Sequence, residues 1–113
     1  MKTRNGFVSN SSSTAFIITN RTKEKKTLVD FVNENPHLVR DFCEEYDEKD
    51  EQYTQENMVA SAMDKDMVFR AGEEKRCVFG DGDGTLIGRV FDYILRDGGE
   101  SPSFAWRFEE MMR

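Results

Sequence analysis

The first clear apolar run of the chain lies at residues 14–19, Thr-Ala-Phe-Ile-Ile-Thr. β-Branched and aromatic residues favour strands, and Asn20, directly after the run, is typical of a turn. The run therefore predicts a strand. Because it is apolar almost throughout, the strand should be central or buried in its sheet. Residues 1–13 are basic and then rich in Ser and Asn, which predicts an arm or loop.

From Thr27 onward the apolar residues recur at the three- and four-residue spacing of amphipathic helices. The pattern predicts four helices and, from a weaker signal capped by Thr54, a fifth. Their apolar positions are Leu28, Phe31, Val32; Leu38, Val39, Phe42, Cys43, Tyr46; Met58, Val59, Ala62, Met63; Leu86, Ile87, Val90, Phe91, Ile94, Leu95; and Phe104, Phe108, Met111, Met112. Asn35-Pro36 and Ser101-Pro102 each predict a helix start, and Gly98-Gly99 predicts a helix end.

Two further strand-like runs, residues 66–70 and 75–79, are joined around Gly72 and predict a β-hairpin. The expected fold class is therefore α+β. We expect a small mixed domain with an N-terminal strand, a β-hairpin and four to five amphipathic helices, covering residues 14–113. A chain of 113 residues is long enough to bury one core.

Membrane and secretion signals are missing from the sequence pattern. No window approaches the ~18 apolar residues of a membrane span. Residues 9–13 interrupt any apolar region of a signal peptide. We therefore expect a cytoplasmic protein with no membrane partner.

The chain has a net charge of -6, and its charged residues are distributed unevenly along the sequence. Residues 1–26 hold six basic side chains and one acidic side chain, whereas in residues 41–57 eight acidic side chains face one lysine. If the second helix continued past Tyr46, helical steps would gather an acidic ridge of Asp41, Glu44, Asp47, Glu48 and Glu51. Such a surface repels nucleic acid and favours a basic protein partner, with simple solubility as the alternative interpretation.

Four residues of potential chemical interest have ordinary structural interpretations. Cys43 and Cys77 lie in apolar patterns without CxxC spacing, so we expect reduced core thiols. His37 is the single histidine and lies in the first turn after a proline, where no catalytic or metal role is expected. Trp106 lies off the predicted terminal helix stripe, and it either covers a core edge or marks an interface.

The glycine-rich loop at residues 80–84 contains two carboxylates after a strand-like run and before a helical pattern. Asp81-x-Asp83-Gly84-Thr85-Leu86 resembles the first motif of haloacid dehalogenase-type phosphatases, in which the first Asp attacks phosphorus and the second works as acid and base. That family carries several βα units after the motif, and this chain is too short for them. A turn and helix cap fits the same residues. The alternative function is a small divalent-metal-dependent phosphoryl- or nucleotide-handling enzyme using Asp81 and Asp83.

The N-terminal 18 residues carry a second resemblance. One or two basic residues, then Phe-Val-Ser-Asn-Ser-Ser-Ser at residues 7–13, then Phe16 and a β-branched pair, are similar to the start of many short phage and bacterial proteins. The resemblance implies a phage or prophage source and an intracellular setting. It implies no reaction.

No complete catalytic or cofactor constellation emerges from the sequence. We therefore expect a small acidic accessory protein, phage-encoded and without cofactors, that acts in the host cytoplasm by non-enzymatic binding to another protein. A specific form would be inhibition of a host nuclease or defence complex through acidic mimicry, with no direct binding to nucleic acid. The expected protein-binding residues are Asp41, Glu44, Glu48, Glu51 and Trp106.

Overall fold

The apolar run near the N-terminus forms the central strand of the protein. In the computed structural model, which describes residues 13–80 and 84–112, β1 (Ser13–Asn20) lies between β4 (Glu74–Gly80) and β6 (Phe104–Met112) and is antiparallel to both. Phe16 and Ile18 are fully buried. The predicted strand and its central position are confirmed.

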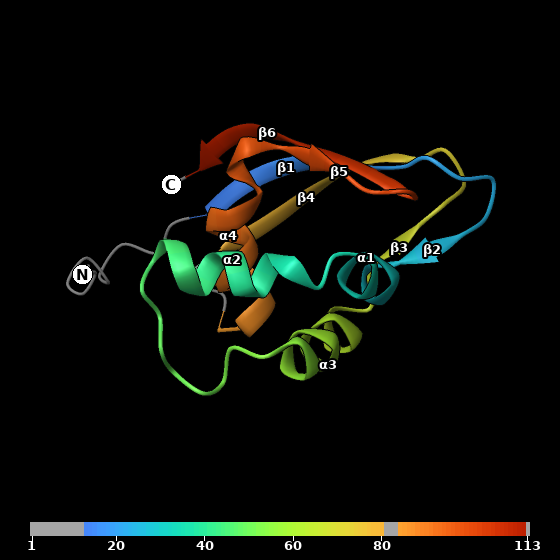
Figure 1. The fold of residues 1–113 in the computed structure, drawn as a ribbon. Coiled ribbons are helices and arrows are strands. Elements are labelled where there is room, and N and C mark those ends of the chain that lie inside the picture. Colours follow the sequence, from blue (N-terminus) through green and yellow to red (C-terminus); the bar gives the residue numbers. More distant parts are fainter. Residues whose placement is uncertain (1–12, 81–83, 113) are drawn as a thin grey trace.

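The fold is a mixed α+β arrangement in which helices cover one side of an antiparallel sheet (Figure 1). The strand order of the four-stranded sheet is β4-β1-β6-β5, with β5 (Gly99–Glu100) at one edge. The short strands β2 (Lys26–Thr27) and β3 (Val68–Phe69) form a second, two-stranded sheet at one end of the molecule (Figure 1). Among the described residues, none of the helices has the length and apolar character that a membrane span requires.

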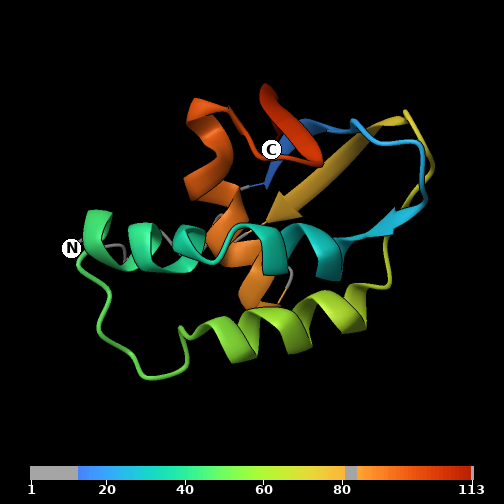
Figure 2. The ribbon, with the colours of Figure 1, turned by 45° about the vertical axis from the view of Figure 1, so that its right-hand side comes forward.

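Four α-helices follow the predicted pattern. They are α1 (Leu28–Glu34), α2 (His37–Glu45), α3 (Gln55–Lys65) and α4 (Leu86–Ile94), and α4 continues into a 3-10 turn, η3 (Leu95–Asp97). Thr54 caps α3 as predicted, because its side chain accepts a hydrogen bond from the N–H of Asn57. Figure 2 shows α3 running alongside α1, while α4 crosses α2 on the sheet side.

The end of α4 also follows the sequence pattern. Gly98 has a φ of 74°, the left-handed conformation that favours glycine and ends the helical segment. The backbone then reverses into β5, which pairs with β6. The chain therefore enters the edge strand of the sheet directly after the end of the helix.

The predicted terminal helix is wrong, because residues 104–112 form strand β6. In a strand, alternate side chains share a face, so Phe104 and Trp106 point inward and are buried. Phe108, expected in a buried helical stripe, is 41% exposed. Ser101-Pro102 does not begin a helix either. Ser101 and Phe104 exchange backbone hydrogen bonds of 2.8 and 3.3 Å across a tight turn between β5 and β6.

The predicted β-hairpin is also wrong, although both of its segments contain strands. β3 pairs with β2, whereas β4 pairs with β1. Between them the chain turns at Gly72, whose φ is 71°, and the N–H of Glu73 donates to the carbonyl of Arg70 at 3.0 Å. The two strands on either side of this turn therefore enter different sheets.

The core between sheet and helices contains many aromatic rings, and Phe31 of α1 contacts three of them. The Phe31 ring makes edge-to-face contacts with Phe91, Phe104 and Trp106, with ring centroids 5.5, 5.1 and 5.1 Å away. Such contacts add to the free energy gained by burying the rings. This cluster joins α1, α4 and β6.

Candidate binding cleft

One face of α2 carries polar residues that follow the helical repeat. His37, Asp41, Glu44 and Glu45 stand at positions i, i+4, i+7 and i+8, so they share a side of the helix. The opposite side of α2 is held in the core by the buried residues Leu38, Val39 and Phe42.

The start of α2 differs in detail from the sequence prediction. Pro36, rather than Asn35, occupies the N-cap position of α2 and makes no side-chain capping bond. Asn35 is buried at the end of α1, where its side-chain amide donates to the carbonyl of Phe31 at 3.0 Å. Asn35 therefore stabilises the end of the preceding helix.

A cleft of about 560 Å³ lies between α2 and the segment that joins η3 to β5. This volume is in the range of ordinary ligand sites. Its carboxylates come from both walls, and among the described residues no Lys or Arg lines it. The lining residues are His37, Leu38, Asp41, Glu44, Glu45, Ile94, Asp97, Gly98, Gly99, Glu100 and Trp106.

The base of the cleft is built by the close approach of Gly99 to Trp106. A Cβ atom at position 99 would lie 2.5 Å from Cζ2 of the Trp106 indole, well inside a normal contact distance, so only glycine fits. Trp106 itself is 7% exposed and stacks edge-on against Phe31. The indole is therefore fixed between the core and the cleft.

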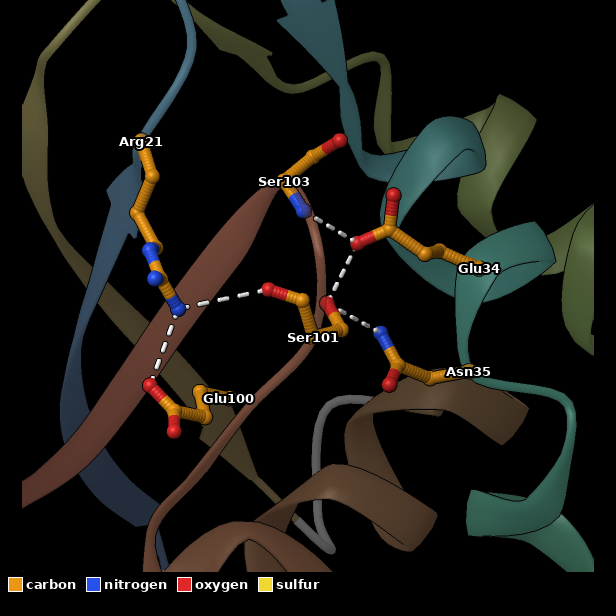
Figure 3. A network of polar contacts seen from close by, with 6 residues as sticks. All are labelled: Arg21, Glu34, Asn35, Glu100, Ser101 and Ser103. Carbon is orange, nitrogen blue, oxygen red and sulfur yellow. Dashed lines mark hydrogen bonds and ion pairs between the residues drawn. The ribbon is translucent and has the colours of Figure 1, made fainter.

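A polar network anchors the β5–β6 turn, and with it the second wall of the cleft (Figure 3). The hydroxyl of Ser101 donates to a carboxylate oxygen of Glu34, and the N–H of Ser103 donates to the same oxygen at 2.8 Å. Asn35 donates to the Ser101 hydroxyl at 3.2 Å. The turn is thus tied to the end of α1.

Arg21 contacts Glu100 and Ser101 beside the same turn. Its guanidinium lies 2.9 Å from a carboxylate oxygen of Glu100 and also donates to the carbonyl of Ser101 at 3.4 Å (Figure 3). Among the carboxylates of the cleft, Glu100 is therefore already paired. Within the described part of the chain, no ion pair joins Asp41, Glu44 or Asp97 to a basic side chain.

We predict that this network makes stability depend on acid pH through Glu34. Burial raises the pKa of Glu34, but the hydrogen bonds from Ser101 and Ser103 outweigh burial and hold the pKa below its usual value of 4.5. A lowered folded-state pKa gives stability that is present above the unfolded-state pKa and is lost as pH falls through the folded-state value. Glu34→Gln should therefore lower the melting temperature at neutral pH.

The difference between Glu34→Gln and the original protein should shrink below pH 4.5. Thermal melts at neutral and acid pH measure it. Glu24→Gln, at an exposed position, is the matched control and should show no such convergence. A Glu34→Gln difference that stays constant across this pH range would contradict the role given to the carboxylate.

The predicted acidic ridge is not formed as a continuous helical face, because α2 ends at Glu45. Asp47 adopts a left-handed conformation with a φ of 52°, and the N–H of Glu48 donates back to the carbonyl of Cys43 at 2.9 Å. This bond is typical of a helix terminus at which the chain turns away. Asp41 and Glu44 therefore line the cleft with Trp106, whereas Glu48 and Glu51 lie beyond the helix and do not.

The glycine-rich loop is described only in part. Asp81 and Asp83, the carboxylates of the alternative enzymatic prediction, lie outside the described residues. Thr85 caps α4 by accepting a hydrogen bond from the N–H of Gly88 at 3.0 Å, in agreement with the predicted helix cap. Within residues 13–80 and 84–112, no group of three or more His, Cys, Asp or Glu side chains is placed to hold a metal ion.

Neither cysteine belongs to the cleft. Cys43 and Cys77 are free thiols, half-buried and buried respectively. Burial raises the pKa of Cys77 to about 12, so its thiol remains protonated at neutral pH and is a poor nucleophile.

Comparisons of the chain with protein-family models, curated proteins and solved structures give no match. The geometry and charge of the cleft are therefore the basis for a functional proposal.

Some of the residues expected to bind protein lie in this cleft, although the sequence pattern predicted a surface and not a cleft. Asp41, Glu44 and Trp106 were expected to be binding residues, and all three line it. Asp97 and Glu100 were not expected. The available signal was the pair of glycines between them, which the sequence analysis used only as a helix stop.

Proposed function

We propose that this protein is a non-enzymatic binding module that takes a basic segment of another protein into the cleft between α2 and β5. The observation that carries the proposal is the charge of the lining, in which Asp41, Glu44 and Asp97 have no basic partner among the described residues. Clustered like charges in a partly enclosed site raise the local concentration of opposite charge. A Lys- or Arg-bearing segment would relieve their mutual repulsion.

The apolar part of the lining supports a polypeptide ligand. Leu38, Ile94 and Trp106 lie in the same cleft as the carboxylates. The long methylene stems of Lys and Arg side chains pack on apolar surface while their charged ends reach acidic groups. A basic segment could therefore use both parts of the lining.

A specific form of this proposal is inhibition of a host nuclease or defence complex by acidic mimicry. It draws on the N-terminal resemblance to short phage proteins, which implies a phage-encoded protein acting in the host cytoplasm. Nucleic-acid-binding enzymes expose basic surfaces, and the cleft would compete for such a surface without itself contacting nucleic acid. Competition between this protein and DNA for a purified nuclease is the corresponding assay, and activity that stays unchanged at saturating protein would count against this form for the nuclease tested.

We predict that removing two cleft charges weakens binding of a basic probe. The probe is the blocked peptide acetyl-Ala-Arg-Ala-Arg-Ala-amide, and the variant is Asp41→Asn with Glu44→Gln. Exposed ion pairs contribute about 0.2–1 kcal/mol each, so we expect roughly five- to tenfold weaker binding at low salt. The loss should decrease at higher salt, because screening already weakens these contacts.

Calorimetric titration at two salt concentrations measures this effect. The control is Glu56→Gln with Asp64→Asn, which removes the same charge from exposed positions of α3 outside the cleft. If the cleft and α3 variants bind the peptide equally, the effect reflects net charge and the cleft is not the site. Absence of peptide binding by the original protein would overturn the proposal itself.

A further inference from the structure

The indole N–H of Trp106 is a buried donor that has no acceptor among residues 13–80 and 84–112. Trp106 is 7% exposed, and no described residue accepts a hydrogen bond from its ring nitrogen. A buried indole N–H normally finds a partner, because leaving a buried donor unsatisfied destabilises the folded state. This donor therefore needs an explanation.

The N–H edge of the indole lies at the cleft. The atoms of Trp106 nearest to the Cβ position of Gly99 are Cζ2, Cε2 and Nε1, at 2.5, 2.8 and 3.2 Å. Gly99 and Trp106 both line the cleft. Because position 99 carries no side chain, this edge of the ring lies against the backbone of Gly99, which itself lines the cleft.

The ring cannot easily turn away to satisfy the donor elsewhere. Phe31 packs edge-on against it with centroids 5.1 Å apart. On the strand, Trp106 pairs with Gly99 on one side and Ile18 on the other. The indole is thus held in the orientation that a ligand in the cleft would meet.

The surroundings restrict what can accept this hydrogen bond. An anionic acceptor would be repelled by Asp41, Glu44 and Asp97, which line the same cleft. The acceptor should therefore be neutral and should belong to a molecule that carries positive charge. A main-chain carbonyl of a Lys- or Arg-bearing peptide satisfies both conditions. A polyamine is protonated at neutral pH and offers only donors.

We propose that Trp106 Nε1–H is the recognition donor of the cleft and binds a main-chain carbonyl of a basic peptide, which selects peptides over polyamines. This inference rests on the proposed function, since it names the chemical group recognised at the same site.

The first test uses the indole resonance, which is a single signal because Trp106 is the only tryptophan. The ¹⁵N-labelled protein is titrated with acetyl-Ala-Arg-Ala-Arg-Ala-amide, with the same peptide carrying Gln for Arg, and with spermidine. A new hydrogen bond to a carbonyl should move the indole proton downfield and slow its exchange with water. We expect this response with the Arg peptide and not with spermidine at saturation.

The second test is Trp106→Phe, which keeps an aromatic ring against Phe31 and removes the N–H. The variant loses one hydrogen bond to the peptide, so peptide affinity should fall roughly tenfold while spermidine affinity stays the same. A thermal melt checks folding. If this variant does not fold, the indole resonance of the original protein decides alone.

Three results would overturn the inference, and they are distinguishable. An Arg peptide that binds without moving the indole signal, or that binds Trp106→Phe with unchanged affinity, would remove the role of the N–H and leave the proposed function standing. An equal indole shift with spermidine would show that the donor does not select peptides. No binding of either cation would overturn the proposed function as well.

Discussion

Replacing Phe31 with alanine should lower the free energy of unfolding by about 4 kcal/mol, within the range of ~3–5 kcal/mol for deleting a buried aromatic side chain. Phe31 is 0% exposed, and its ring touches three other aromatic rings from α4 and β6. The cavity would open where all these elements meet, so neighbouring side chains cannot collapse into it without moving a helix or a strand. Urea denaturation followed by circular dichroism measures the loss.

Phe108→Ala is the matched control for Phe31→Ala. Phe108 is 41% exposed, and its ring contacts Phe16 with centroids 6.4 Å apart. We expect a loss of roughly 1 kcal/mol, because much less apolar surface leaves water at this position on folding. Comparable losses for the two variants would mean that Phe108 lies in the core, as the helical interpretation of residues 102–112 requires, and would contradict strand β6.

The contrast between these phenylalanines shows why the terminal segment was predicted wrongly. Phe104 and Phe108 are four residues apart. This spacing places two side chains on the same face of a helix, and it also places them on the same face of a strand, because every second residue of a strand shares a face. Trp106 lies off the helical stripe and on the strand stripe. Pairing with β1, whose residues lie 84 to 99 positions away from their partners along the chain, favours the strand, and no local pattern contains that pairing.

The prediction of a β-hairpin was wrong for a related reason. Both strand-like segments were found, and the turn at Gly72 was found between them. The partner of each strand was not predictable, because β3 pairs with β2 and β4 pairs with β1. Local residue types indicate that a segment is extended. They do not indicate which other segment supplies its hydrogen bonds.

Part of the cleft lining was predictable, because local sequence patterns define the polar face of a helix. Asp41 and Glu44 belong to the polar face of an amphipathic helix, which the helical repeat defines. The apolar stripe of this helix was predicted to run to Tyr46, and the helix ends at Glu45, with Asp47 in a left-handed conformation beyond it. Glu100 reaches the cleft only because β5 pairs with β6 and the turn is fixed on α1 by Glu34. These contacts join segments far apart in the sequence.

Arg96→Met should lower the free energy of unfolding by about 2–4 kcal/mol, because removal of one partner leaves a buried charge poorly compensated. The side chain of Asp92 is 0% exposed, and Nη2 of Arg96 lies 3.0 Å from its Oδ1. Nε of Arg96 also donates to the carbonyl of Asp92 at 2.7 Å. The hydroxyl of Thr14 donates to the same carboxylate at 2.6 Å, which joins α4 to β1.

Two further variants separate this buried contact from the general loss of an arginine. Arg96→Lys keeps the positive charge without the planar fork, so its stability should lie between those of the original protein and Arg96→Met. Arg76→Met removes an arginine that pairs with Glu109 and Glu110 on the exposed face of the sheet, where water already screens the charges, and it should change stability little. Chemical denaturation of all three variants at one pH makes the comparison. If Arg96→Met and Arg76→Met lose the same stability, the carboxylate of Asp92 does not depend on Arg96 for its contribution to the folded state.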